Sequence, residues 1–298
     1  MIDKRRIDAL LKPASWLLVA AAAVFLVVVA RRHWDEIARI TLGPEQWSAI
    51  AALALAYGLS LLLLAAAWHA ILKAARARPL APAHSMRIHA SAQLAKYVPG
   101  NVFHLVGRHM LHRAAGMDDR RLAAAALVEV LLMLAAALLV ATACLAIEPP
   151  PGSEQWRWLL LPVGFAAALV GLGIARKLAR GEIAPFAIAF ALHLAFFTMM
   201  GAVLAAILAI LGQPWSLSVA GGGIAAWIAG FVTPGAPGGL GVREAVMVLA
   251  GGHVARPDVL IVGAGLFRLV TFGGDLVCFA AGWLLFRRQV IPPASKSP

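Results

Sequence analysis

Residues 233–244 read Thr-Pro-Gly-Ala-Pro-Gly-Gly-Leu-Gly-Val-Arg-Glu and separate two strongly apolar segments. Two prolines and four glycines fall within the eight residues 234–241. This run cannot continue a helix, because proline lacks a backbone N–H and glycine loses much backbone entropy when it is fixed. Non-helical backbone at membrane depth is tolerated only where it is buried in protein or lines a wet cavity. The stretch therefore predicts a broken membrane helix; the alternative is a tight cytoplasmic turn capped by Glu244.

A half-helix that begins near Val242 would direct free N–H groups and a partial positive charge into such a cavity. Transporters with broken helices hold anionic groups in this way. We assign the break itself to Pro234, Gly235 and Pro237. The residues of this half that we assign to a headgroup-binding site are Gly238, Gly239, Gly241, Arg243 and Glu244.

The composition indicates an integral membrane protein. Hydrophobic residues make up 62% of the 298 residues, charged residues only 13%, and the mean hydropathy is +0.84. A soluble domain would carry about 25% charged residues. We therefore predict one all-α polytopic domain over residues 1–298, with seven to eight transmembrane helices and two Pro/Gly-broken, re-entrant segments. The expected spans are Ala14–Ala30, Trp47–Leu72, Leu122–Ile147, Trp156–Ala175, Ile183–Leu211, Trp215–Val232 and Val259–Phe286.

The positive charges indicate the topology of the chain. The net charge is +12, and the basic residues gather in short loops, so anionic lipid explains them better than nucleic acid. Residues 73–121 carry nine Lys or Arg, whereas residues 148–155 carry none. This alternation predicts a multi-pass protein of the bacterial inner membrane with a cytoplasmic N-terminus. The basic start of the chain followed by Ala14–Ala30 also fits a signal peptide, but we interpret it as an uncleaved first span.

A second interruption lies between residues 84 and 113. His89, Gln93 and Lys96 share one helical face at i, i+4 and i+7. The sequence Tyr-Val-Pro-Gly at 97–100 then ends that helix, and Asn101 is a good N-cap for a new one. We predict two half-helices forming a re-entrant hairpin; the alternative is an amphipathic pair lying flat on the cytoplasmic leaflet. We assign the break to Pro99 and Gly100, and the binding residues of this half are Lys96, Tyr97, Asn101, His104 and Arg108.

Ionisable residues also occur inside the expected spans, where they usually face a partner or water. Arg268, Thr271 and Asp275 form one polar stripe in the last span, and an ion pair between this arginine and aspartate is one reading of it. Glu129 could balance Arg108, Arg243 or Arg268. We therefore assign Arg268 to the binding site, and Glu129 and Asp275 to charge balance. His193, among apolar neighbours, is expected to be a core histidine, and Arg243 and Glu244 should point about 100° apart on a helix.

Together these groups are mostly cationic and stand in apolar surroundings, which favours an anionic or phosphate-bearing lipid as the ligand. The sequence has no His-Glu-x-x-His, no paired Cys, no Gly-x-Ser-x-Gly and no Walker-type loop. We therefore expect no catalytic residue, no cofactor and no metal site.

The two interrupted stretches resemble the transmembrane region of the lysylphosphatidylglycerol synthase family. The resemblance lies in residues 93–102 with Gly107 and Arg108, in residues 237–244, and in the Leu-Phe-Arg-Leu-Val-Thr setting of Arg268. It implies that the two stretches form the two halves of a lipid-handling cavity. In full-length members this membrane region is assigned the movement of an aminoacylated lipid, which a following soluble domain makes. These 298 residues do not contain that soluble domain, so we expect no synthase activity.

The sequence therefore predicts a non-enzymatic flippase or translocator of a phospholipid, glycolipid or hopanoid-pathway lipid with an anionic headgroup. Its partners would be membrane lipids, with a lipid- or glycan-biosynthesis enzyme as a further candidate, and not nucleic acid. One alternative is a non-transporting accessory subunit of a glycolipid or hopanoid enzyme. Another is an intramembrane transferase, since such enzymes also use intramembrane Arg, His and Glu.

Overall fold

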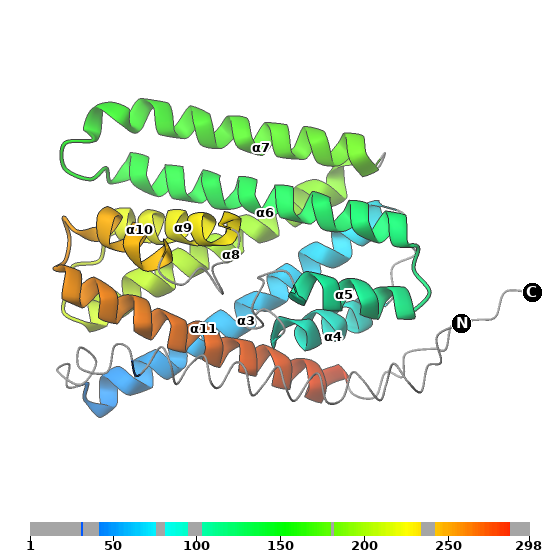
Figure 1. Ribbon diagram of the computed structural model, residues 1–298, viewed down its shortest axis with the longest axis horizontal. Helices are drawn as coiled ribbons and strands as arrows, with labels where there is room; N and C mark the ends of the chain where they lie inside the picture. The colour runs from blue at the N-terminus through cyan, green and yellow to red at the C-terminus, as the bar shows by residue number, and fades with distance from the viewer. Residues whose placement is uncertain are drawn as a thin grey trace, which may run out of the picture.

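The computed structural model describes residues 31, 42–75, 81–94, 103–179, 182–233 and 242–286. Within these residues the fold is all-α, with turns and loops between the helices and no strand. Figure 1 shows long helices that cross one another and shorter ones set between them. The elements are α3 (Pro44–Ala74), α4 (Pro82–Gln93), α5 (Phe103–Ala114), α6 (Asp119–Ile147), η2 (Glu154–Trp156), α7 (Arg157–Ala179), α8 (Ile183–Ile210), α9 (Leu217–Val232), α10 (Val242–Gly251) and α11 (Pro257–Phe286).

Five of these helices, α3, α6, α7, α8 and α11, are long and apolar enough to cross a membrane. The protein is therefore a multi-pass membrane protein, as the composition predicted. The expected spans that fall on the described residues are each found as a helix, to within a few residues at either end. The first expected span, Ala14–Ala30, lies outside the described residues.

The apolar helix α9 is shorter than the other expected spans. Its 16 residues correspond to about 24 Å, compared with about 30 Å of hydrocarbon in a bilayer. Its N-cap is Ser216, whose side chain accepts a hydrogen bond from the Val219 N–H at 3.3 Å. After α9, the half-helix α10 packs back against it and also contacts α11.

The first half of the chain contains a comparable pair of short helices. The half-helices α4 and α5 pack against each other, and α4 also lies against the long helices α3 and α11. Buried positions occur along the whole length of α4, from His84 to Gln93. The helix α4 therefore packs into the bundle along its length. The two breaks themselves, at residues 95–102 and 234–241, lie outside the described residues.

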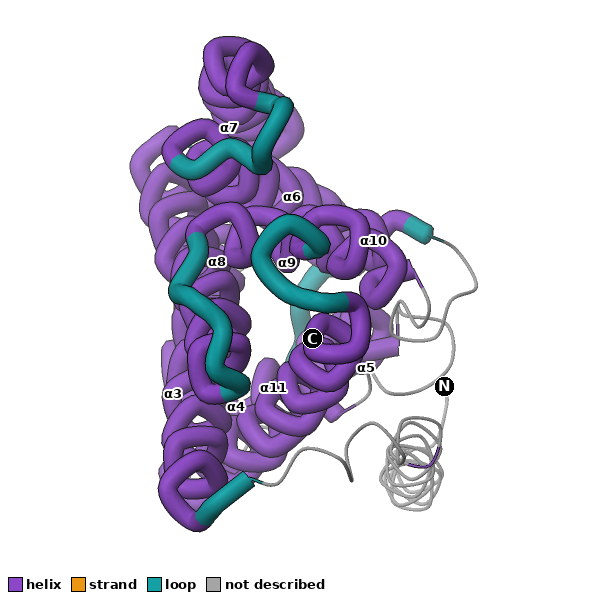
Figure 2. Tube along the Cα trace, turned by 90° about the vertical axis from the view of Figure 1, so that its left-hand side faces the viewer, coloured by secondary structure: helices purple, strands orange, loops and turns teal. Residues whose placement is uncertain are grey.

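The long helices pack in a core around α3, α8 and α11, with α6 alongside α8 and α9. The largest side chains that are almost fully buried include Trp68, Phe186 and Phe197. In contrast, α7 packs mainly against α6 and forms the outer edge of the bundle (Figure 2). Its apolar side chains, such as Trp158 and Leu169, are exposed, as expected for a helix that faces lipid.

Candidate functional site

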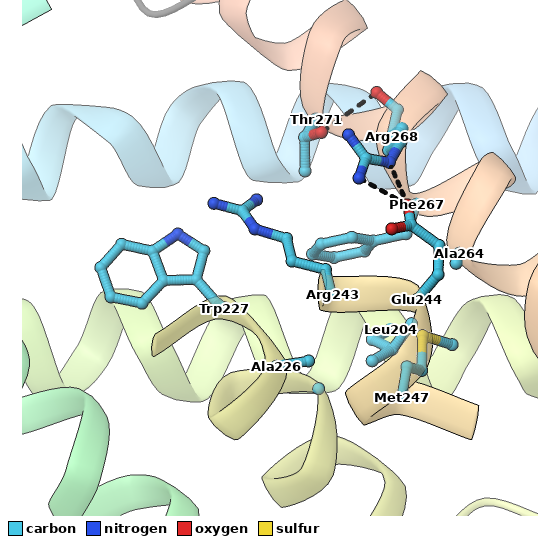
Figure 3. Close-up of a pocket in the computed structure, with 11 residues that line it drawn as sticks. Leu204, Ala226, Trp227, Arg243, Glu244, Met247, Ala264, Phe267, Arg268 and Thr271 are labelled. Atoms are coloured by element: carbon cyan, nitrogen blue, oxygen red, sulfur yellow. Dashed lines mark hydrogen bonds and ion pairs between the residues drawn. The ribbon is translucent and has the colours of Figure 1, made fainter. Parts of the chain in front are cut away.

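A pocket opens between α9, α10 and α11, with one side formed by Leu204 of α8 (Figure 3). It encloses about 430 Å³ of empty space, counting its open mouth. The lining is mostly apolar, and its charged groups come from α10 and α11. The lining residues are Leu204, Gly223, Ala226, Trp227, Arg243, Glu244, Met247, Ala264, Phe267, Arg268 and Thr271.

An ion pair joins α10 to α11 at the edge of this pocket. Glu244 Oε1 accepts a hydrogen bond from Arg268 Nε at 2.7 Å and lies 2.5 Å from a terminal nitrogen of the same guanidinium. Both side chains are largely buried, with 18% of the glutamate and 14% of the arginine exposed. The Thr271 hydroxyl donates to the Arg268 carbonyl at 3.0 Å, within the polar stripe that the sequence predicted on this helix. The ion pair described for Arg268 is thus with Glu244 of another helix, whereas the sequence suggested Asp275 as its partner.

Arg243 points in a different direction from its neighbour Glu244. Its side chain extends past Phe267 toward the space between Trp227 and Thr271 (Figure 3). The two adjacent side chains thus diverge, as the geometry of a helix predicted. The path is set by Gly230 on α9, because a Cβ there would come within 2.6 Å of Arg243 Cγ and 2.7 Å of Nε.

Trp227 forms the aromatic wall of the pocket. Its ring stacks on Phe231, with centroids 5.1 Å apart and an interplanar angle of 14°, and meets Phe197 edge-on at 4.8 Å. These contacts hold the indole in place beside the Arg243 guanidinium. Such an arrangement supplies an apolar surface on one side of the pocket and positive charge on the other.

A second charged cluster lies in the other half of the chain. Arg108 of α5 pairs with Glu129 of α6 through two hydrogen bonds, the Nη1–Oε1 bond measuring 2.7 Å and the Nη2–Oε2 bond being short. Both residues are buried, with 4% and 5% exposed. The Arg108 guanidinium also lies over the Trp68 ring, 3.8 Å from its centroid. Glu129 therefore balances Arg108 among the three arginines that the sequence left open.

Two histidines surround this ion pair and are held by it. His112 Nδ1 donates to the Arg108 carbonyl at 2.8 Å, and its Nε2 accepts from the Trp68 indole at 3.3 Å. His89 Nε2 lies 2.7 Å from Gln93 Nε2, and its Nδ1 is 3.4 Å from Arg108 Nη1. The predicted shared face of His89 and Gln93 is thus confirmed, and it faces Arg108.

His193 of α8 belongs to the same neighbourhood. It is fully buried, as expected of a core histidine, and lies close enough to Glu129 and Arg108 to feel both charges. The Ala189 carbonyl of the preceding turn is near its ring, yet neither ring nitrogen makes a hydrogen bond of normal geometry. Buried polar atoms without a partner are rare in native proteins.

The two clusters have a common plan. In each half, a half-helix follows a Pro-Gly break and joins the next long helix through a largely buried Arg–Glu pair. Pro99-Gly100 precedes Arg108 by nine positions, and Pro234-Gly235 precedes Arg243 by nine. In the first pair the half-helix carries the arginine, and in the second it carries the glutamate.

A third polar cluster joins the end of α6 to the start of α9. Glu148 accepts hydrogen bonds from the Ser216 hydroxyl at 2.5 Å, the Leu217 N–H at 2.8 Å and the Ser218 hydroxyl at 3.3 Å. The Ser218 hydroxyl also lies 2.8 Å from His253 Nε2. Partial burial raises the pKa of Glu148, but the hydrogen bonds outweigh it, so the pKa lies below its ordinary value. This cluster joins the end of α6, the start of α9 and the turn after α10, and we call it the Glu148 corner.

The structure brings together some of the predicted site residues and leaves others undescribed. Arg243, Glu244 and Arg268 share one pocket, Arg108 and Glu129 form the second cluster, and Asp275 is fully buried on α11. His104 lies in α5, but its side chain is outside the described part. The predicted residues that lie wholly outside it are Lys96, Tyr97, Pro99, Gly100, Asn101, Pro234, Gly235, Pro237, Gly238, Gly239 and Gly241.

Sequence reasoning missed three residues that shape the two clusters: Trp68, Trp227 and Gly230. Tryptophans of membrane helices usually lie at the interfaces, near the helix ends. Trp227 stands inside α9, and Trp68 lies about two turns before the end of α3. Their position away from the ends was the available signal. No comparable signal marks Gly230 within a glycine-rich helix.

Among the described residues, no group of three or more His, Cys, Asp or Glu side chains could hold a metal ion. Comparison with protein-family models and with curated proteins finds no match for this chain.

Proposed function

We propose that this protein is a translocator that carries an anionic, phosphate-bearing lipid across the bacterial inner membrane. The observation that carries the proposal is the pocket of α9, α10 and α11, in which two arginines stand in a largely apolar lining of a multi-pass membrane protein. Ionisable residues in such a setting commonly mark a substrate pathway. An arginine guanidinium also matches the geometry of phosphate oxygens.

The charged groups of the pocket support an anionic headgroup. Among the described lining residues, Arg243 and Arg268 each carry a positive charge, and Glu244 carries a negative charge. An anionic headgroup would therefore meet more positive than negative side chains in this lining. Guanidinium groups can hold its phosphate oxygens through charge-assisted hydrogen bonds.

The shape of the pocket supports a lipid rather than a free anion. Apolar side chains such as Trp227, Met247 and Phe267 surround the charged groups, and the pocket has an open mouth. A headgroup can bind the arginines while acyl chains remain in the surrounding hydrocarbon. The Pro/Gly-rich sequences in the two halves also support a transporter, because interrupted helices commonly flank a substrate site at the bilayer midplane.

The positions of the basic loops support the orientation that we propose, with a cytoplasmic N-terminus. The external side would then carry the corner formed by Glu148, Ser216 and His253. In this orientation the pocket would exchange its lipid through a movement of the short helix α10.

The test is a headgroup-accessibility assay with purified protein in liposomes. Phosphatidylglycerol labelled on its headgroup is followed with a membrane-impermeant quencher. Loss of a charge-assisted hydrogen bond of about 1.5–3 kcal/mol should slow Arg243→Ala by about 10- to 100-fold. Arg256→Ala is the matched control, because Arg256 is exposed and pairs with Asp258 at the surface, and it should keep the wild-type rate.

Two results would contradict the proposal. One is wild-type protein that moves the labelled lipid no faster than protein-free liposomes, which would favour the accessory-subunit alternative. The other is an Arg243→Ala variant as fast as wild type, which would remove the pocket from the transport path.

A further inference from the structure

We propose that Glu129 and His193 form a proton-binding site that fills when an anion draws Arg108 away from Glu129. On the proposed function, on which this inference rests, a headgroup on its path across the protein would compete for Arg108 as well as for the arginines of the pocket. Each anionic lipid would then move together with one proton. The proposal starts from the Arg108–Glu129 pair, which is more buried than the Glu244–Arg268 pair.

The buried position makes the state of Glu129 depend on Arg108. Both charges are almost completely removed from water, and the carboxylate receives both of its hydrogen bonds from this one guanidinium. An isolated carboxylate in such a place costs several kcal/mol, so it takes up a proton instead. Any anion that competes for Arg108 therefore drives protonation of Glu129.

His193 is the group that can share this proton. It is fully buried and lies close enough to Glu129 to feel its charge, and its ring nitrogens make no hydrogen bond of normal geometry with the described residues. A neutral imidazole offers one donor and one acceptor, and a carboxyl released from Arg108 can use either. His193 thus gains a partner in the same step in which Glu129 loses one.

The other groups around Glu129 are already engaged. From α5, His112 donates to the Arg108 carbonyl and accepts from Trp68 of α3, which makes it neutral with its proton on Nδ1. From α4, His89 faces Gln93 and Arg108. His69 of α3 faces Ser85, 3.2 Å away. The helix α9 carries no ionisable residue, and the basic residues of α7 packed along α6 lie near the ends of α7.

The half-helix α5 is suited to move Arg108. It has 12 residues and packs mainly against α4 and α6, whereas the long helices each contact several others. A small shift of α5 would separate Arg108 from Glu129 and would also loosen the contacts that Arg108 and His112 make with Trp68 of α3.

The charges balance in this exchange. In the empty state Arg108 and Glu129 sum to zero. When a headgroup with one negative charge takes the donors of Arg108, one proton from water binds to Glu129 or His193, and the sum is again zero. Without that proton the occupied cluster would hold one uncompensated negative charge inside the protein.

The experiment measures proton uptake during lipid binding. Short-chain phosphatidylglycerol is titrated into the full-length protein in detergent by calorimetry, in two buffers of different ionisation enthalpy. Wild type should take up about one proton per lipid bound, and infrared difference spectra should show the carbonyl band of a newly protonated carboxyl. Glu129→Gln should bind the lipid without proton uptake and without that band.

A second variant keeps the test valid if Glu129→Gln is unstable. His193→Gln leaves the Arg108–Glu129 pair intact and should lower the proton uptake measured at neutral pH at least twofold. The exposed His253 provides the matched control, and His253→Gln should take up protons as wild type does. Lipid binding without proton uptake in the wild type would overturn this inference and leave the proposed function intact. Absence of any lipid binding would overturn the proposed function, and this inference with it.

Discussion

Glu244 and Arg268 form an ion pair across the interface of α10 and α11, with Glu244 Oε1 2.7 Å from Arg268 Nε. Since Arg243, beside Glu244 in the chain, points away into the pocket, the glutamate neutralises the arginine of the opposite helix. Glu244 is the acidic residue among the described lining groups, so a change at residue 244 changes the charge of this lining.

Removal of this negative charge should change which phosphate headgroup the protein prefers. Glu244→Gln raises the net charge of the described lining by one, so a doubly charged headgroup gains more than a singly charged one. We expect Glu244→Gln to shift the ratio of bound phosphatidic acid, in its doubly charged form, to bound phosphatidylglycerol at least tenfold toward phosphatidic acid. Native mass spectrometry of both lipids in competition measures this ratio.

The matched control is Glu154→Gln, which removes a negative charge from an exposed residue. Its lipid preference should equal that of wild type. An unchanged ratio in Glu244→Gln would show that the pocket charge does not select the headgroup.

Removal of only one charge from the buried Arg108–Glu129 pair should lower the stability of the protein. Glu129→Leu leaves a buried guanidinium without its carboxylate, and we expect a loss of about 3–5 kcal/mol in the free energy of unfolding. The double variant Arg108→Met, Glu129→Leu removes both charges and should be the more stable of the two. Denaturant unfolding in detergent, followed by circular dichroism, measures both.

An exposed ion pair gives the reference for that experiment. Arg113 and Asp119 are 3.2 Å apart with much of each side chain exposed, so Arg113→Ala should cost less than about 1 kcal/mol. If Glu129→Leu proves as mild as this control, the Arg108–Glu129 pair does not hold α5 against α6.

The position of Arg243 can be tested without changing any charge. In Gly230→Ala the added methyl group would occupy the space of the Arg243 side chain, because the new Cβ would lie only 2.6 Å from Arg243 Cγ. The arginine must move, so lipid translocation should fall several-fold while the helix itself gains from the better helix former. The liposome assay and a thermal unfolding curve separate the two effects.

Gly173 offers the control for this substitution. It lies on α7, and a Cβ there would meet no atom within 4 Å. Gly173→Ala should leave translocation unchanged and stabilise the protein by up to about 1 kcal/mol. Equal translocation rates for the two alanine variants would contradict the placement of Arg243 in the transport path.

The corner around Glu148 should depend on pH in a defined direction. Its pKa is lower in the folded protein than in the unfolded chain, so the carboxylate stabilises the fold above its ordinary pKa. That stabilisation is lost as the pH falls through the lowered, folded-state value. We expect hydrogen exchange of the Leu217 N–H to accelerate in this acidic range, and Glu148→Gln to show the faster exchange already at neutral pH.

The helices α8 and α3 provide the comparison within the same experiment. Their amides should keep their protection over this range, because the Glu148 hydrogen bonds end at α9. Uniform loss of protection throughout the protein would instead indicate global acid unfolding.

The long helices could be predicted from the sequence because their apolar runs are as long as a bilayer is thick. The partners of the buried charges could not be predicted from the sequence. Glu129 had three candidate arginines, and the pairing with Arg108 across 21 positions depends on how α5 lies on α6. For Arg268, the sequence offered a carboxylate on the same helix, Asp275. The ion pair with Glu244 depends on how α10 lies against α11, which no spacing in the sequence indicates.

The polar face of α4 likewise could be predicted only in part. Spacing alone placed His89 with Gln93, and the structure has them in contact. The spacing could not indicate that Trp68, from a helix earlier in the chain, covers the guanidinium of Arg108. Local periodicity identifies which residues share a helix face. Tertiary packing decides which residues of other helices contact that face.

The crossing of α3 and α11 has a consequence for how a ligand could enter. Gly58 and Gly274 meet there so closely that a Cβ on Gly58 would lie 2.7 Å from the Gly274 carbonyl oxygen, and one on Gly274 would lie 2.8 Å from the Gly58 nitrogen. The two backbones are in direct contact, with no side chains between them. A movement of α11 toward α3 would therefore produce a backbone clash. The side of the pocket that carries Arg268 is therefore fixed against α3. A bulky ligand would have to enter by displacing α10, which has ten residues.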